Sequence, residues 1–240
     1  MSWHAKDLIG FDLETTGTNP REARIVTAAI TETRAGRPKT THEWLANPGI
    51  PIPPETVAIH GITTARATAE GRPPAEVADE VATELVRHWR QGTPVVAYNA
   101  SFDLTLLAAE LSRHNLPSLA ARMGPGNEPG PVIDPLTIDR AVDRYRKGKR
   151  TLEAVCVEYG VVLDSAHDAA SDALAAVQVA HALAERHTKV SGATVWDLHR
   201  WQVTWYADWA AGYRHWLRSQ GRTGDDIDIR WPLREPVPGH

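Results

Sequence analysis

The chain has little cysteine and no long apolar run. Cys156 is the single cysteine among 240 residues, so no internal disulfide can form. The N-terminus lacks the apolar segment of a signal peptide, and no stretch is long and apolar enough to span a membrane. We therefore expect a cytoplasmic protein that does not contact a membrane.

A surplus of positive charge is absent too. Lysine and arginine number 26 against 30 aspartate and glutamate residues, which gives a formal net charge of −4. Nucleic-acid-binding proteins often carry an overall basic charge, so any attraction to nucleic acid must be local in this chain. A local basic cluster at residues 140–150 could hold phosphates, although solvated surface charge is the commoner explanation.

Length and composition allow one sizeable hydrophobic core, because 42% of the 240 residues are hydrophobic. We expect one compact domain over residues 1–190 and an aromatic-rich helical extension over residues 191–220. Residues 221–240 are rich in glycine and proline and are expected to form a flexible tail.

Hydrophobic periodicity predicts the order of strands and helices. Strands are predicted at residues 7–14, 24–33, 39–45, 94–98 and 131–135. Helices are predicted at residues 74–92, 101–115, 151–160, 168–186 and 194–220, with a further helix leading into residue 140. The first three strands follow one another through short links, which predicts an antiparallel arrangement. Residues 47–74 are expected to form a surface loop with at most a short helix.

Four acidic residues and one histidine stand in three short blocks. They are Asp12 and Glu14, then Asp103, then His167 and Asp172. Asp12 and Glu14 interrupt an apolar strand two residues apart, so both carboxylates point to the same face. Buried carboxylates must be paired or metal-bound, and this favours a functional role over a solvated strand edge.

Four carboxylates gathered in one pocket would repel one another unless cations neutralise them. Hard cations prefer oxygen ligands, which indicates two divalent ions, Mg²⁺ or Mn²⁺, rather than zinc. Such a pair of ions is suited to phosphodiester cleavage. Taken singly, Asp103 could equally stabilise a helix start, and His167 could be an ordinary surface residue.

These blocks, in this order, resemble the DEDDh 3′-to-5′ exonucleases, a family that includes the proofreading subunit of bacterial replicative polymerases, ribonuclease T and oligoribonuclease. The resemblance covers roughly residues 5–187. It includes the turn at Thr15, Thr16 and Gly17, the loop from Ile59 to Ile62, and Asp134 near the end of a late strand. The chain departs from many relatives at Tyr98, where they have histidine.

The resemblance implies an α/β fold of the ribonuclease H-like type. This fold has a mixed five-stranded sheet, whose first three strands are antiparallel, flanked by helices. Residues 1–190 would form the exonuclease domain, and the α-helical C-terminal extension lies beyond the resemblance.

The resemblance also implies a role for each block. Asp12, Glu14 and Asp172 would hold the ion that binds the attacking water. Asp12 would bridge to a second ion supported by Asp103, and His167 would act as the base. The reaction would release nucleoside 5′-monophosphates from the 3′ end of single-stranded or frayed nucleic acid, with DNA favoured over RNA.

Recognition of a 3′ end would involve further residues by the same resemblance. Contacts to the terminal 3′-hydroxyl and sugar are expected from Thr15, Thr16 and Gly17. His60, Ile62 and Phe102 would line the base-binding groove, and Asn99 would orient a loop or touch the substrate backbone. For Ile62 and Phe102 ordinary core packing remains an alternative, and for Asn99 a structural turn does.

The extension carries an aromatic stripe at helical spacing, formed by Trp201, Trp205, Trp209, Tyr213 and Trp216. Such a face packs on its own domain or docks a partner, either a polymerase subunit or a second copy in a homodimer. Three rivals to a free exonuclease therefore stay open. They are a proofreading subunit active mainly in a polymerase complex, a non-catalytic nucleic-acid-binding scaffold, and an enzyme that hydrolyses small nucleotides.

Overall fold

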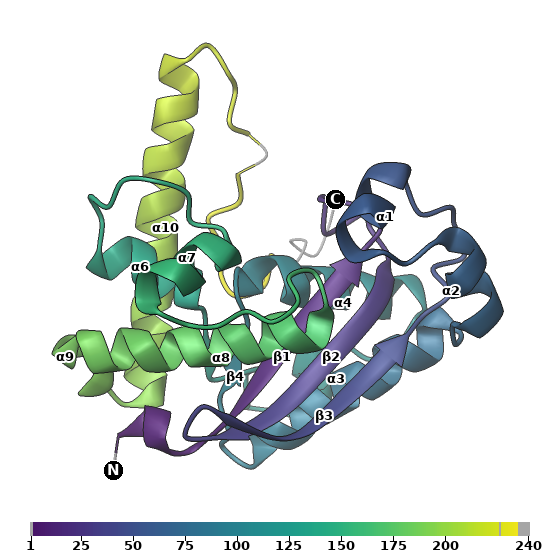
Figure 1. The fold of residues 1–240 in the computed structure, drawn as a ribbon, viewed down its shortest axis with the longest axis horizontal. Helices are drawn as coiled ribbons and strands as arrows, with labels where there is room; N and C mark the ends of the chain where they lie inside the picture. Colours follow the sequence, from purple (N-terminus) through teal and green to yellow (C-terminus); the bar gives the residue numbers. More distant parts are fainter. Residues whose placement is uncertain (1, 226, 235–240) are drawn as a thin grey trace.

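The computed structural model describes residues 2–225 and 227–234. Its centre is a five-stranded sheet with the strand order β3-β2-β1-β4-β5 (Figure 1). The strands are β1 (Asp7–Thr15), β2 (Ile25–Arg34), β3 (Arg37–Leu45), β4 (Val95–Val96) and β5 (Val132–Ile133). The first three strands are antiparallel, and β4 and β5 run parallel to β1. The predicted ribonuclease H-like sheet is confirmed.

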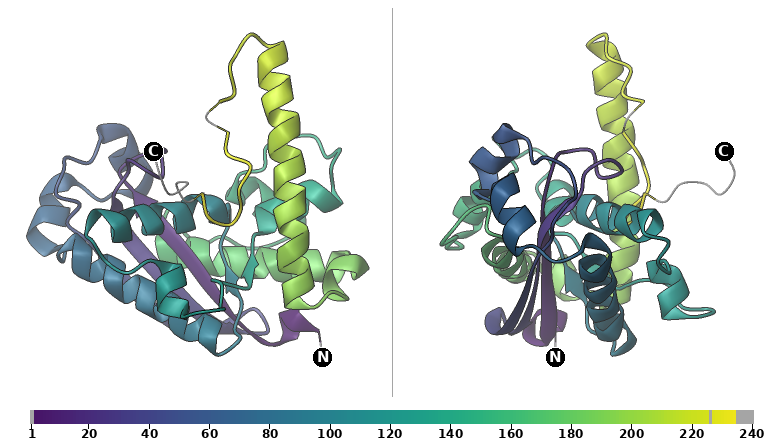
Figure 2. Two further views of the ribbon diagram at one scale, coloured as in Figure 1. Left: turned by 180° about the vertical axis from the view of Figure 1, so that it is seen from behind. Right: turned by 90° about the vertical axis from the view of Figure 1, so that its right-hand side faces the viewer.

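Helices cover both faces of this sheet. A short 3-10 helix, η1 (Trp3–Ala5), precedes β1. The α-helices are α1 (Pro54–His60), α2 (Thr64–Glu70), α3 (Pro74–Arg90), α4 (Ala100–Arg113), α5 (Leu119–Met123), α6 (Pro135–Val142), α7 (Leu152–Tyr159), α8 (Ala169–Arg186), α9 (Thr188–Ser191) and α10 (Val195–Ser219). Seen along the edge of the sheet, α3 and α4 lie on one side and α8 with α7 on the other (Figure 2).

Strand β1 supplies both cores because its side chains alternate. Ile9 and Phe11 pack in the cluster formed with α3 and α4. Leu8 packs in the cluster formed with α7 and α8. A central strand covered on both faces reads as an apolar run, which is why polar residues within it are informative.

Residues 47–74 contain two helices, α1 and α2, where we expected at most a short one. The Oγ1 atom of Thr63 caps α2 by accepting a hydrogen bond from the Arg66 backbone N–H at 3.1 Å. Ala67 is fully buried between α2 and the sheet edge, beside Val26 and Ile52. Helices of seven residues are too short to show a hydrophobic period, so the prediction failed there.

Helix α10 projects past the carboxyl end of β1 (Figure 1). Its base is tied to the sheet edge by Gln202, which is fully buried. The Gln202 Oε1 atom accepts a hydrogen bond from the Asp134 N–H at 2.6 Å, and its Nε2 donates to the Val132 carbonyl at 3.1 Å. The buried face of α10 thus contains Gln202, His199 and Tyr206 beside aliphatic residues, and most of the tryptophan stripe lies next to it, half-buried.

The end of the chain differs from the flexible tail that we expected. Trp231 is 5% exposed, and its Nε1 donates a hydrogen bond to the Asp134 carboxylate at 3.3 Å. The Arg234 guanidinium donates to the Ser101 hydroxyl at 2.8 Å. Composition predicts irregular backbone in this stretch, but it does not show that a tryptophan fills a gap in the core. Residues 226 and 235–240 lie outside the described residues.

Across residues 2–225 and 227–234, no helix combines the length and the apolar character that crossing a membrane requires.

Candidate active site

The face of β1 that carries Asp12 and Glu14 points toward α8. Gly10 lies two residues earlier on the same face, where a Cβ atom would stand only 2.3 Å from the carbonyl oxygen of Ala173. Glycine therefore permits the strand and helix to approach this closely. The consequence is functional, because the same approach brings Asp172 beside the two acids of β1.

Asp103 reaches the site from the start of α4. Asn99 adopts a left-handed conformation (φ 62°) that turns the chain sharply from β4 into this helix. The Asn99 N–H donates to the buried Asp134 carboxylate at 3.0 Å, which fixes the turn. One Asp103 oxygen then accepts a hydrogen bond from the Leu13 N–H at 3.2 Å, between the two acids of β1.

His167 and Asp172 flank the start of α8. The His167 N–H donates to the Asp172 carboxylate at 3.2 Å, and His167 is itself left-handed (φ 65°). Such a conformation is uncommon outside glycine and often occurs at functional sites. Ligand atoms of Glu14, His167 and Asp172 all lie within 4.8 Å of one another. The structure therefore gathers the acids and the histidine of all three sequence blocks.

Burial and mutual repulsion dominate the electrostatics of this cluster. Burial raises the pKa of Asp12 well above its ordinary value, and Asp103, Asp172 and Glu14 add to the rise. Burial also raises the pKa of Glu14 to about 7 and that of Asp172 to about 6. For Asp103, burial raises the pKa against the opposing effect of the Leu13 N–H. The four carboxylates resist ionising together without a neutralising cation.

The donor set fits a divalent cation. The Oδ1 atom of Asp172 is buried and has no hydrogen-bond partner among the described residues. It lies in a cluster whose other donors are chiefly carboxylate oxygens, the ligands that hard cations prefer. An unpaired buried oxygen is costly, so a bound ion would satisfy it.

Two further acids at this site were missed from the sequence. Asp168 caps α8 by accepting hydrogen bonds from Ser171, and its charge adds to the rise in the pKa of Glu14. Glu153 of α7 places Oε1 3.3 Å from the Nε2 atom of His167. The capping pattern at Asp168 was visible in the sequence, but nothing local pairs Glu153 with a histidine 14 residues later.

The turn after β1 is held by its own side chains. The Thr15 hydroxyl donates to the Gly17 carbonyl at 2.8 Å, and the Thr16 hydroxyl accepts from the Arg24 N–H at 2.9 Å. Both threonines are buried. Any contact that they make with substrate therefore comes from a rigid turn.

His60, at the end of α1, also lies beside this turn. Its Nδ1 accepts a hydrogen bond from the Ile62 N–H at 3.1 Å. Burial lowers the pKa of His60, and a charge on His167 lowers it further, although the Thr15 backbone opposes this effect. The Nε2 atom is buried without a hydrogen-bond partner among the described residues. His60 therefore binds a proton less readily than a free histidine, and it lies next to the turn after β1.

Ile62 and Phe102 are each half-buried. Ile62 packs on the small cluster of Val26, Ile52 and Ala67, and Phe102 packs on the core between α3 and α4. Core packing therefore accounts for part of both side chains, as the alternative from the sequence anticipated. Their exposed portions are what remains available to a base.

The basic cluster is used inside the protein more than we expected. Arg146 and Arg150 both pair with the fully buried Asp139. The Tyr98 hydroxyl, at the position where relatives have histidine, donates to the Arg150 carbonyl at 2.8 Å. Solvated charge describes Lys147 and Lys149, which are exposed, but not these two arginines.

Comparison with protein families decides the assignment. Residues 9–180 match the RNase_T family model, which is described as an exonuclease. The chain belongs to this exonuclease family. The match confirms the resemblance to the DEDDh 3′-to-5′ exonucleases, and it ends before α10. The RNase_T exonucleases depend on divalent metals, in agreement with the donor set described above.

Relatives and solved structures agree with the family. The chain is similar to DNA polymerase III PolC-type of Streptococcus agalactiae (30% identity over 174 residues), covering 72% of this chain and 11% of that protein. It is also similar to an exonuclease I from Methylocaldum szegediense (26% identity, TM-score 0.63), covering 78% of this chain and 42% of the other. Exonuclease I of E. coli, solved with a dT13 oligonucleotide, shares the fold at 22% identity and a TM-score of 0.64, covering 77% and 42% of the two chains.

Proposed function

We propose that this protein is a metal-dependent 3′-to-5′ exonuclease that acts on single-stranded or frayed ends. It releases nucleoside 5′-monophosphates. The observation that carries the proposal is the convergence of Asp12, Glu14, Asp103, Asp172 and His167 at one end of the sheet, within a domain of an exonuclease family.

In the proposed mechanism the carboxylates would hold two cations, Mg²⁺ or Mn²⁺. Asp12, Glu14 and Asp172 would hold one of them, and Asp12 with Asp103 would hold the other. Bound divalent cations supply charge neutralisation and an activated water. His167 removes the proton of the attacking water, and Glu153, 3.3 Å away, stabilises the imidazolium that results.

The same proposal assigns recognition of the 3′ end to the rigid turn after β1. Thr15, Thr16 and Gly17 contact the terminal sugar and its 3′-hydroxyl. His60, Ile62 and Phe102 line the groove for the terminal base, because stacking and apolar contacts accept any base. Asn99 positions α4 and therefore acts on Asp103. Single-stranded DNA is the favoured substrate, since solved exonuclease I structures contain DNA oligonucleotides.

A second candidate is a proofreading exonuclease that works within a polymerase complex. The similarity to PolC-type DNA polymerase III favours it. The chain spans only 11% of that relative's length.

The direct test is a time course with 5′-end-labelled single-stranded DNA and RNA of equal sequence, with Mg²⁺, Mn²⁺ or a chelator. Progressive shortening from the 3′ end, dependent on metal and absent in Asp12→Asn, supports the proposal. Loss of the 5′ label at the first time point, or cleavage that persists with chelator, contradicts it. Cleavage that appears only with a polymerase extract favours the proofreading subunit.

A further inference from the structure

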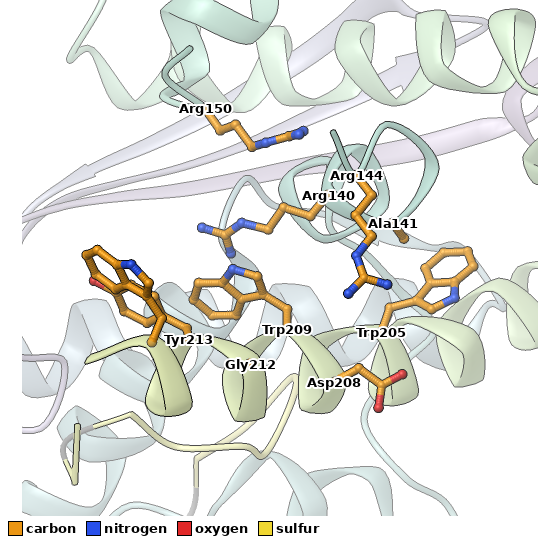
Figure 3. Close-up of a pocket in the computed structure, with 10 residues that line it drawn as sticks. Arg140, Ala141, Arg144, Arg150, Trp205, Asp208, Trp209, Gly212 and Tyr213 are labelled. Carbon is orange, nitrogen blue, oxygen red and sulfur yellow. The ribbon is translucent and has the colours of Figure 1, made fainter. Parts of the chain in front are cut away.

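The aromatic stripe and the basic cluster face each other across a cleft of about 1120 Å³. The wall on α10 is formed by Trp205, Trp209, Tyr213 and Trp216, and the opposite wall by Arg140, Arg144 and Arg150. Figure 3 shows Arg140 and Arg144 extending toward the rings, whereas the Arg150 guanidinium pairs with Asp139. The family match ends at residue 180, so it includes the arginine wall but not the aromatic wall on α10.

The aromatic wall is a ladder of nearly parallel rings. Trp209 and Tyr213 stack with ring centroids 5.5 Å apart and planes 11° apart, and Tyr213 and Trp216 follow at 5.6 Å and 14°. Trp216 is 51% exposed at the outer end. The three rings span seven residues of helix, or about 10 Å along its axis. Arg140 and neighbouring rings already cover faces of Trp209 and Tyr213, so the exposed Trp216 at the end of the ladder is the ring suited to stacking on a base.

The opposite wall carries positive charge that the protein neutralises only in part, because Arg150 pairs with Asp139 and the buried Asp134 carboxylate acts on Arg140. Within residues 2–225 and 227–234, Arg140 and Arg144 form no ion pair with a carboxylate. The Arg140 guanidinium instead lies over the Trp209 ring, 3.7 Å from its centroid. Asp208 is the acid in the lining, and in Figure 3 its carboxylate lies on the side away from Arg150. The free positive charge beside aromatic rings is the combination that binds a nucleic-acid strand.

The cleft and the acidic site share one side of the molecule. Helix α10 and the connection from α6 to α7 both rise beyond the carboxyl end of β1, where Asp12 and Glu14 lie (Figure 1). A hydrogen bond also links the cleft to the acidic site. The Tyr98 hydroxyl donates to the Arg150 carbonyl, and Tyr98 directly precedes Asn99. A strand leaving the acidic site on the α10 side would therefore meet the cleft.

We propose that this cleft is a second binding site for single-stranded nucleic acid, which holds the strand on the 5′ side of the nucleotide being removed. Trp216 stacks on a base, and Arg140 and Arg144 contact phosphates. The proposal rests on the proposed function for the direction of the strand. A second copy of the chain is a poorer occupant, since a symmetric dimer through this face would bring the same arginines of both copies together.

The test compares full-length variants that change only exposed side chains of the cleft. Arg144→Glu and Trp216→Ala alter its two walls, and Arg200→Glu, 64% exposed on α10 outside the lining, is the matched control. Binding of a labelled oligonucleotide of about 16 nucleotides, the upper end of ordinary site sizes, is followed by fluorescence anisotropy with chelator present. We expect Arg144→Glu and Trp216→Ala each to weaken binding about tenfold, and Arg200→Glu to bind like wild type.

A second readout separates this proposal from the exonuclease assignment. With Mg²⁺, the variants should degrade oligonucleotides of about 4 nucleotides at the wild-type rate and lose activity only on the long strand, through a raised KM. Wild-type protein that binds through the cleft but never cleaves would contradict the proposed function alone. Unchanged binding in both cleft variants would overturn the second site. The second site would also be overturned if light scattering shows a dimer, and Trp216→Ala dissociates this dimer without changing DNA binding.

Discussion

Asp12 is the residue on which the electrostatics of the site converge, because its pKa is raised by burial and by four neighbouring carboxylates. Asp12→Asn removes one of these charges. We expect the metal-free variant to melt higher than metal-free wild type, by about 2–4 °C for each kcal/mol of relieved repulsion. The stabilisation that Mg²⁺ gives to wild type should be absent. Thermal melts with Mg²⁺ and with chelator measure both effects, and an unchanged Mg²⁺ response would remove Asp12 from the metal site.

His167 has a different predicted role, as a base rather than a ligand. His167→Ala should lower turnover about a hundredfold or more while retaining the Mg²⁺-dependent rise in melting temperature. The Glu153→Gln variant serves as a partner control, since it keeps the histidine but weakens support for its protonated form. Turnover that is unaffected in His167→Ala would exclude this histidine from the reaction.

At the scale of secondary-structure elements, the site depends on the close contact between β1 and α8. Gly10→Ala would place a methyl group 2.3 Å from the Ala173 carbonyl, so the strand and helix must separate. We expect a loss of about 1–3 kcal/mol in the free energy of unfolding, together with lower activity, as Asp172 moves away from Asp12. Denaturant unfolding measures the loss of stability, and the nuclease assay measures the loss of activity.

The control for that substitution is Gly212→Ala. Gly212 lies within α10, where an added Cβ meets nothing within 4 Å. Because glycine weakens a helix interior, the alanine should stabilise the protein by about 0.5–1 kcal/mol. Equal destabilisation by both substitutions would show that the close approach at Gly10 has no special role.

Packing of α10 on β5 also predicts a pH dependence of stability. The Nδ1 atom of His199 accepts a hydrogen bond from the Val132 N–H at 3.0 Å, and burial lowers the pKa of His199 from 6.5. As the pH falls, His199 therefore binds a proton at a higher pH in the unfolded chain than in the folded protein. The stability that His199 contributes is complete above pH 6.5 and is lost as the pH falls below this value. The free energy of unfolding then changes by at most about 1.4 kcal/mol per pH unit.

His199→Asn tests this dependence, because asparagine can accept the same hydrogen bond but does not titrate. The difference in the free energy of unfolding between wild type and variant should change as the pH falls below 6.5. It should stay constant above. A difference that is constant from pH 5 to pH 8, the range in which histidine ordinarily titrates, would contradict the prediction.

At the scale of the whole molecule, the sequence predicted what depends on local pattern. The spacing of Asp12 and Glu14 within an apolar strand placed both on one face, and the capping residue Thr151 marked the start of α7, where its hydroxyl accepts from the Ala154 N–H. Resemblance to a known family then joined three blocks that lie far apart in the chain. The mixed five-stranded sheet and the gathering of the acids followed from that resemblance.

Features that depend on contacts between distant residues were not predictable. Gly10 is special only because Ala173 lies against it, and Gln202 and Trp231 matter only because both bind Asp134. The tryptophan stripe illustrates the limit. Helical period revealed an aromatic face. It could not show that a neighbouring face of α10 is the buried one, which leaves the rings beside the arginines of α6 and of the connection that follows it.

The identity of the first product tests the central claim most directly. A single-stranded oligonucleotide carrying a labelled 3′-terminal nucleotide is incubated with Mg²⁺, and the first labelled product is separated by chromatography. We predict a labelled nucleoside 5′-monophosphate from wild type and no product from Asp12→Asn. A labelled fragment longer than one nucleotide, a nucleoside without its 5′-phosphate, or equal release by Asp12→Asn would contradict hydrolysis of the 3′-terminal phosphodiester by this site.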